Sequence, residues 1–113
     1  MQLVAEDGEL RTPDGDVVER EYPGNGVLLI AASRLEQLKE QGNRSELPPG
    51  ELAQAAIAMG ACAVGWDHVA YTLWPWGKWD RKHSDDMTKQ DKIDMLVKAG
   101  AFIAAEIDRM EGK

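Results

Sequence analysis

The residues best suited to chemistry form an aromatic and cationic stretch in the second half of the chain. All four tryptophans lie between residues 66 and 79, and the run Trp74-Pro75-Trp76-Gly77-Lys78-Trp79 precedes Arg81. Aromatic faces interleaved with cations are one way to hold a nucleobase and its phosphate. Trp74, Trp76 and Trp79 would then stack on the base, and Lys78 and Arg81 would contact phosphate. Alternatively, the rings cover one end of a helical core, as large aromatic residues do in small domains.

A further cation, Lys98, lies between Val97 and Ala99 in a strongly apolar helical pattern. A lysine at such a position either extends its ammonium group to solvent or points into a pocket as an anion ligand. We keep it as a candidate phosphate ligand beside Lys78 and Arg81.

Metal chemistry would require carboxylates that converge from two helices, because magnesium is bound by oxygen ligands next to substrate phosphates. Some acids are three or four residues apart and can share a helix face, but such spacings are also common on any solvated helix. No tight four-acid pattern is present, so we expect no resident metal. The candidates are Glu36, Glu40, Glu51, Asp91, Asp94 and Glu106.

The remaining reactive residue types give no recognisable constellation. His68 and His83 lack the spacing of a zinc site, and Cys62 lies among alanines and a glycine, which is typical of a small core residue. The Gly24-Asn25-Gly26 segment lacks the rest of either glycine-rich phosphate-binding fingerprint.

These side chains must be positioned by helices. Three helical segments are predicted, at about 27–41, 49–64 and from Thr88 to just before Gly112, with an aromatic loop at 65–80 and a helical turn near 67–72. Before them, the turn signals Asp7-Gly8 and Pro13-Asp14-Gly15 predict a β-hairpin or a three-stranded meander over residues 1–26. The predicted fold is therefore mainly α, of the α+β class: a three-helix bundle-like unit over 27–113 with an N-terminal β element, in one domain of 1–113.

The helical segments carry apolar stripes with three- and four-residue spacing. The stripe of the first comprises Leu28, Ala31, Ala32, Leu35 and Leu38. The stripe of the last comprises Ile93, Leu96, Val97, Gly100, Ile103, Ile107 and Met110. Thr88 and Asp91 indicate a capping box at the start of the last helix. Gly60 costs its helix roughly 1 kcal/mol in propensity, so we expect another helix to pack closely against it.

The charge distribution limits the possible partners. The net charge is −7, and residues 1–22 contain seven acids against two bases, which accounts for −5. Direct nucleic-acid binding is not expected, because it needs a clustered positive footprint. The acidic front can meet a basic host protein, or can simply keep the domain in solution.

The cysteine count and the apolar runs bear on the compartment. Cys62 is the only cysteine of the 113-residue chain, and no apolar run approaches the roughly 20 residues that span a bilayer. With no basic, apolar leader in the sequence, we expect a cytoplasmic protein without a membrane partner. A helical domain of this size often completes its core by self-association, which favours a homo-oligomer.

Several of these segments together resemble a family of small bacteriophage and prophage proteins. The likeness rests on Trp74-Pro75-Trp76, on the run from Asp94 to Ala101 and on the run from Ile103 to Arg109. Gly50-Glu51-Leu52-Ala53 resembles the middle helix of that family. The similarity covers roughly residues 30–110.

That family is distantly similar to MazG-type helical nucleotide pyrophosphohydrolases. Its members commonly carry a Glu-His-Asp-Asp-like run between the first two helices, where this sequence has Asn43-Arg44-Ser45-Glu46-Leu47-Pro48. The His-Asp-Asp part is missing, whereas Glu51 and Asp94 remain. The resemblance implies a helical frame that binds a nucleotide without cleaving it.

Three functional hypotheses follow from these observations. The leading one is a phage-type accessory protein that binds without catalysis or cofactor and sequesters a nucleotide-like ligand or host immune signal in the host cytoplasm. The second is a MazG-like, magnesium-dependent nucleotide pyrophosphohydrolase that uses Glu51 and Asp94. The third is an acidic protein–protein inhibitor that presents the N-terminal segment to a host factor.

Overall fold

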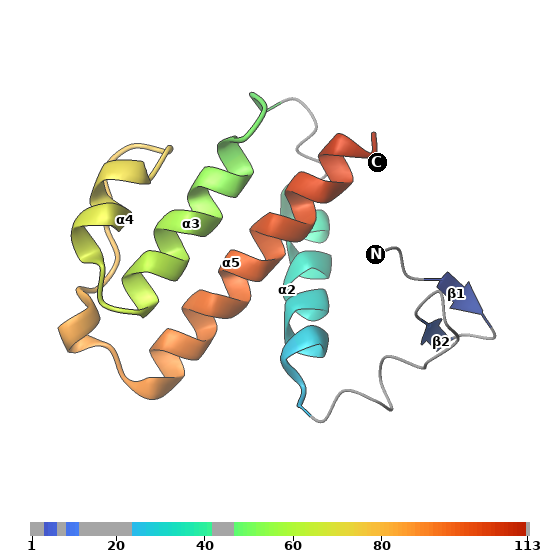
Figure 1. Cartoon of the computed structure of the whole chain (residues 1–113), viewed down its shortest axis with the longest axis horizontal. Coiled ribbons are helices and arrows are strands. Elements are labelled where there is room, and N and C mark those ends of the chain that lie inside the picture. The colour runs from blue at the N-terminus through green and yellow to red at the C-terminus, as the bar shows by residue number, and fades with distance from the viewer. Residues whose placement is uncertain (1–3, 7–8, 12–23, 42–46, 113) are drawn as a thin grey trace.

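Four helices form the described part of the molecule and lie side by side in the order α4, α3, α5, α2 (Figure 1). The computed structural model describes residues 4–6, 9–11, 24–41 and 47–112. The helices are α2 (Gly26–Gln41), α3 (Glu51–Ala63), α4 (Asp67–Leu73) and α5 (Lys89–Met110), with a short 3₁₀ turn, η1, at Ser84–Asp86.

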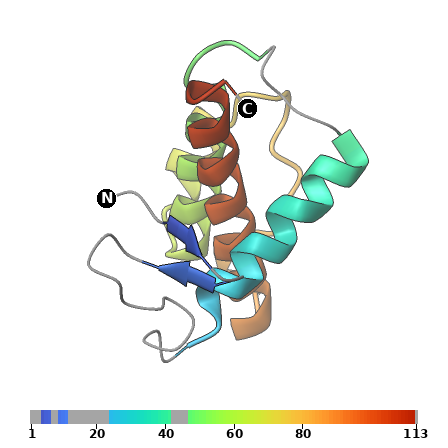
Figure 2. The ribbon, with the colours of Figure 1, turned by 90° about the vertical axis from the view of Figure 1, so that its right-hand side faces the viewer.

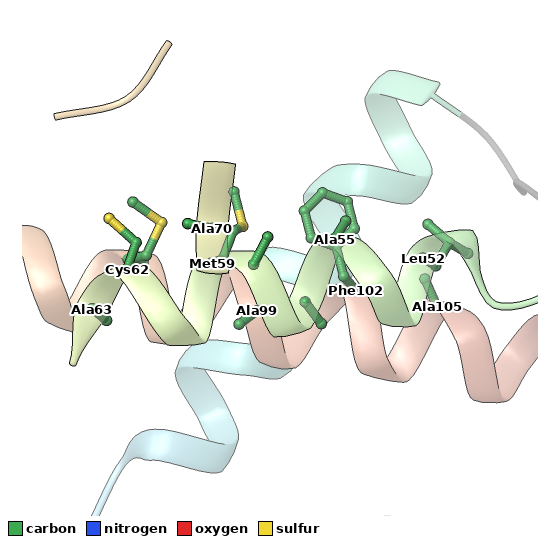
Figure 3. Close-up of a cluster of buried hydrophobic side chains, with 12 residues drawn as sticks. Leu52, Ala55, Met59, Cys62, Ala63, Ala70, Ala99, Phe102 and Ala105 are labelled. Carbon is green, nitrogen blue, oxygen red and sulfur yellow. The ribbon is translucent and has the colours of Figure 1, made fainter. Parts of the chain in front are cut away.

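The core lies where α3 meets α5 and α4. Leu52, Ala55, Met59 and Cys62 point from α3 toward its neighbours, and Phe102 comes from α5 (Figure 3). Most of the other core residues are alanines, so the helix backbones can approach closely and Met59 and Phe102 fill the space between them. The alanine-rich sequence of α3 is therefore a close-packing surface.

The start of α5 confirms the capping box expected from the sequence. The Thr88 hydroxyl accepts a hydrogen bond from the Asp91 backbone N–H at 3.0 Å, and the Asp91 carboxylate accepts one from the Thr88 N–H at 3.0 Å. Two otherwise unpaired backbone donors are thereby satisfied. Helix α3 begins after Gly50, whose φ of 85° suits glycine, and the helix spans 51–63 against an expected 49–64.

Helix α2 packs against α5 on the side away from α3 (Figure 1). Figure 2 shows α2 inclined to α5. Ile30 lies directly over Gly100, where an added methyl group would be only 2.5 Å from Ile30 Cδ1. Farther along, the Arg34 guanidinium donates to the Asp108 carboxylate at 3.0 Å. Gly100 thus leaves the space that the Ile30 side chain occupies, and a larger residue there would collide with it.

The two apolar stripes read from the sequence lie largely outside the core. Leu28, Leu35 and Leu38 of α2 and Ile103 and Ile107 of α5 are exposed. The buried side of α5 is made of other residues: Met95, Ala99, Ala101, Phe102, Ala105 and Glu106. The expected close packing against Gly60 is also not found among the described residues, because no atom lies within 4 Å of a methyl group placed there.

The predicted α+β class is wrong, and the fold is helical. The described β structure consists of two three-residue strands, β1 (Val4–Glu6) and β2 (Glu9–Arg11), which pair antiparallel. The third strand of a meander would fall on 17–22, outside the described residues. A short pair of strands buries too little apolar surface to define a layer of the fold.

The predicted number of helices was too low as well. The segment interpreted as an aromatic loop contains α4, which has seven residues and extends the helical turn expected near 67–72. Two turns are too few for an apolar period to become visible in the sequence.

Candidate functional site

The predicted aromatic site forms a compact cluster on the core. Trp74 packs edge-on against Trp76 and Trp79, with ring centroids 5.3 and 5.2 Å apart. Trp76 continues this contact to Phe102 of α5 at 5.4 Å. All three rings are partly buried against the core residues. Edge-to-face contacts of this kind stabilise the cluster and use ring surface that would otherwise stack on a base.

The indole N–H groups of the cluster point mostly into the protein. The Trp74 Nε1 donates to the Trp76 carbonyl at 3.0 Å, and the Trp76 Nε1 donates to the Glu51 carboxylate. Trp79 Nε1 is buried, with no acceptor among the described residues. Glu51, a candidate metal ligand, therefore anchors the tryptophan cluster to the start of α3.

A pocket opens between α2, α5 and residues 80–87, with a volume of about 820 Å³. Helix α2 supplies one wall, α5 the other, and the segment that follows the tryptophans closes one end. The lining residues are Leu29, Ala32, Ser33, Glu36, Asp80, Arg81, Lys82, Met87, Asp91, Asp94, Met95, Val97 and Lys98. This size lies within the range of small-molecule sites, which is roughly 300–1,000 Å³.

The pocket wall carries charges of both signs. The Lys82 ammonium lies 3.3 Å from the Asp91 carboxylate. The pKa of Asp91 is lowered, first by the Thr88 backbone hydrogen bond and then by that from Lys82. The Arg81 guanidinium lies 5.9 Å from the centre of the Trp74 ring, at the edge of cation–π range. Lys98 is exposed on α5 and has no ion-pair partner within the described part of the chain.

The segment that closes the pocket is fastened by a buried carboxylate that sequence reasoning missed. Asp67, at the start of α4, accepts hydrogen bonds from the Ser84 backbone N–H at 2.8 Å and the Ser84 hydroxyl at 2.5 Å. The His83 Nε2 lies 3.5 Å from the same carboxylate. Burial acts to raise the pKa of Asp67, but the Ser84 hydrogen bonds and the nearby His83 lower it overall.

Cys62 belongs to the same buried network. Its Sγ lies 3.7 Å from the Asp67 Oδ1 and 3.6 Å from the Lys82 carbonyl oxygen. Burial, followed by the negative charge of Asp67, raises the pKa of the Cys62 thiol to about 11. A thiol with this pKa carries very little thiolate at neutral pH, which agrees with a structural role for Cys62.

The candidate carboxylates have separate partners. Asp94 accepts from the Gln90 amide at 2.9 Å, and Glu106 is buried in an ion pair with Arg109 at 2.6 Å. The Arg109 hydrogen bonds lower the pKa of Glu106 against the effect of burial. Among residues 4–6, 9–11, 24–41 and 47–112, no three His, Cys, Asp or Glu side chains are grouped closely enough to bind a metal.

No family model matches this chain, and neither the curated proteins nor the solved structures contain a significant match. None of the described helices is long and apolar enough to cross a membrane.

The structure brings together only part of the predicted site. Arg81, Lys98 and Asp94 line the pocket, whereas Trp74, Trp76, Trp79, Lys78 and Glu51 are not among its lining residues. The sequence offers only a weak signal for Asp67 and Ser84, since both are polar residues next to predicted turns. Many surface residues share that feature, so it does not identify a buried pair. The acidic stretch over residues 1–22 lies mostly outside the described residues.

Proposed function

We propose that this protein binds a nucleotide-like small molecule, without converting it, in the pocket between α2, α5 and residues 80–87. The supporting observation is the composition of the pocket wall, where cations, carboxylates and apolar side chains line a volume of about 820 Å³. A ligand with a flat apolar body and polar groups at its edges matches such a wall.

The charges in the pocket favour a particular kind of nucleotide. Arg81 and Lys98 form no ion pair with the described residues and can contact phosphate, whereas Lys82 is engaged with Asp91. Glu36, Asp80 and Asp94 would repel a bare polyanion, but their oxygens can accept hydrogen bonds from the exocyclic amino groups of a nucleobase. The best match is therefore a nucleotide with an amino-bearing base and few phosphates, such as a nucleoside monophosphate or a cyclic dinucleotide.

A binding protein of this kind acts by sequestration. In the phage setting that the sequence resemblance implies, the ligand would be a signal nucleotide of the host, held in the host cytoplasm away from its receptor. Such a role requires affinity and abundance and no catalytic group.

Isothermal titration calorimetry against nucleoside monophosphates, triphosphates and cyclic dinucleotides tests the proposal. We expect at least one of them to bind, and Lys98→Ala to weaken that binding about tenfold or more through loss of a charge-assisted hydrogen bond. Lys89→Ala is the matched control, since Lys89 is also exposed on α5 but does not line the pocket. Absence of binding by the folded protein to every ligand in the panel would refute the proposal.

A second candidate function is magnesium-dependent hydrolysis of nucleoside triphosphates. One observation favours it, because Glu36 from α2 and Asp91 and Asp94 from α5 face the same pocket. A ligand with its own magnesium would have to draw these carboxylates together and release Asp91 from Lys82. Release of pyrophosphate that depends on magnesium and is abolished by Asp94→Asn would establish hydrolysis in place of simple binding.

A further inference from the structure

The polar side chains that line the pocket are nearly all charged. Four acids and three bases are among its 13 lining residues, and Ser33 is the one uncharged polar residue beside them. Within the part of the chain that the structure describes, no asparagine, glutamine or aromatic side chain lines the pocket. Side chains that bind a ligand here must therefore accept its hydrogen-bond donors with carboxylates and donate to its acceptors with cations.

This composition limits which nucleobase can be recognised. An amide side chain presents one donor and one acceptor next to each other, which is how asparagine and glutamine pair with adenine. A carboxylate presents two acceptors, and a guanidinium presents two donors in one plane. The pocket therefore suits a base that carries two neighbouring donors and, separately, two neighbouring acceptors.

Guanine carries both kinds of pair. Its N1–H and its N2 amino group are neighbouring donors, and its O6 and N7 are neighbouring acceptors that arginine or lysine can contact. Adenine and cytosine have an unprotonated ring nitrogen beside the amino group, and the lone pair of that nitrogen would face a carboxylate oxygen. We propose that the pocket selects nucleotides of guanine, an inference that rests on the proposed binding of a nucleotide at this site.

Glu36 is the carboxylate that we assign to the donor pair of guanine. Asp91 of α5 already pairs with Lys82 at 3.3 Å. One oxygen of Asp94 accepts from the Gln90 amide at 2.9 Å. Glu36, on the α2 wall, forms no ion pair or side-chain hydrogen bond with another described residue, so both of its oxygens can accept.

The two cations without an ion pair then divide between the base and the phosphate. Arg81 presents its donors in a plane, which matches O6 and N7 of guanine. Lys98 carries a compact ammonium group, which suits a phosphate oxygen. Asp80 directly precedes Arg81 in the chain and belongs to the same end of the pocket, which leaves Glu36 for the donor edge of the base.

Isothermal titration calorimetry with matched ligands tests the selection. The guanine, hypoxanthine and adenine forms are compared as monophosphates, triphosphates and cyclic dinucleotides. In each series that binds, we expect the guanine form to bind about tenfold or more tightly than the other two, because hypoxanthine lacks the N2 amino group and adenine reverses the donor pattern. Equal or tighter binding of the adenine or the hypoxanthine form would overturn the selection while leaving nucleotide binding intact. Absence of binding in all three series would refute the proposed function itself.

A single substitution tests the assigned carboxylate. Glu36→Gln replaces one acceptor oxygen by an amide donor of nearly the same size, and it should reduce the ratio of guanine to adenine affinity by about tenfold or more. The ratio is the readout, because loss of a negative charge alone strengthens the binding of every phosphate-bearing ligand. Glu40→Gln is the control, since Glu40 is exposed on the same helix and does not line the pocket. Circular dichroism checks the helix content of both variants. An unchanged ratio in Glu36→Gln, or an equal change in Glu40→Gln, would overturn the assignment of Glu36.

Discussion

Helices α3 and α2 both pack against α5, but the two contacts are of different kinds. Helix α3 buries eight of its 13 residues, mostly alanines together with Leu52 and Met59. Among the described side chains of α2, only Arg34 is buried. The α3 contact is a close-packed surface of buried side chains (Figure 3), whereas the α2 contact includes Ile30 over Gly100 and the Arg34–Asp108 ion pair.

This difference shows that a helix with the stronger aliphatic pattern need not contribute more to the core of its own chain. Alanines bring the backbones of α3 and α5 together, so that a few larger side chains fill the interface. The leucines of α2 stay about half exposed, so they bury less apolar surface within the chain than the residues of α3. The stability of the isolated chain should therefore depend on α3 much more than on α2.

The largest effect is expected for truncation in the α3 contact. Met59→Ala removes a fully buried side chain between α3 and its neighbours and should lower the free energy of unfolding by about 2–5 kcal/mol. Leu35→Ala on α2 should lower it by about 1 kcal/mol or less, since Leu35 is half exposed. Urea denaturation at low protein concentration measures both, because dilution removes any contribution from self-association. Equal losses of unfolding free energy for the two variants would contradict the conclusion that α3 stabilises the chain more than α2 does.

The next effect concerns the buried carboxylate that joins α4 to the pocket-closing segment. Asp67→Ala leaves the Ser84 hydroxyl and N–H without their acceptor and should lower the free energy of unfolding by about 2 kcal/mol. The pKa of Asp67 is below its ordinary value of 3.8 in the folded chain, so the unfolded chain binds more protons between the two values. The stability that Asp67 contributes is complete above the unfolded pKa and is lost as the pH falls through the folded one.

The pH dependence can be checked with a matched variant. Denaturation midpoints of the wild type should fall from about pH 5 downward, and those of Asp67→Asn should fall less steeply over the same interval. Asp85 lies nearby and is exposed, which makes Asp85→Asn a suitable control. If Asp85→Asn flattens the profile as much as Asp67→Asn, the acid sensitivity does not come from the buried group.

Local signals predicted the helices of this fold, but not their partners. The capping box at Thr88 and the three long helices were recognisable because caps and helical periods are encoded within a few residues. The side of α5 that faces α3 was not recognisable, because Ala99 and Ala105 are weakly hydrophobic while the exposed Ile103 and Ile107 are strongly so. Periodicity therefore identified the more hydrophobic face, which is not the face buried within the chain.

For the candidate site, the sequence indicated some of the residues that line the pocket but not the pocket itself. Arg81 and Lys98 were selected as isolated cations beside apolar or aromatic residues, and both line the pocket. The tryptophans were selected as aromatic faces interleaved with cations. They pack against the core, which was the stated alternative, because their large apolar area makes burial favourable. The pocket depends on how α2 crosses α5, which is a tertiary property without a local sequence signal.

A smaller effect is expected where Ile30 of α2 lies over Gly100 of α5. Gly100→Ala gains helix propensity of about 1 kcal/mol but places a methyl group 2.5 Å from Ile30 Cδ1. We expect a net loss of about 1 kcal/mol, because overpacking usually costs about 1–3 kcal/mol. When Ile30 is already replaced by alanine, adding Gly100→Ala should stabilise the protein, because the methyl group then meets no side chain. If Gly100→Ala stabilises the protein while Ile30 is intact, then α2 can shift away from α5 to accept the added methyl group.

The smallest effect is expected for the ion pair that completes the α2 contact. Asp108→Asn weakens the pairing with Arg34 and should cost roughly 0.5–1 kcal/mol, since the Arg34 side chain is only 10% exposed. Lys82→Gln interrupts an ion pair in which the lysine is 62% exposed and should cost less than about 0.5 kcal/mol. Added salt should increase the difference between the two ion pairs, because screening weakens an exposed pair more than a shielded one. Raising the salt concentration should therefore leave most of the Asp108→Asn effect intact, and a complete loss of that effect would mean that α2 exposes Arg34 to solvent and is joined to α5 by little more than Ile30.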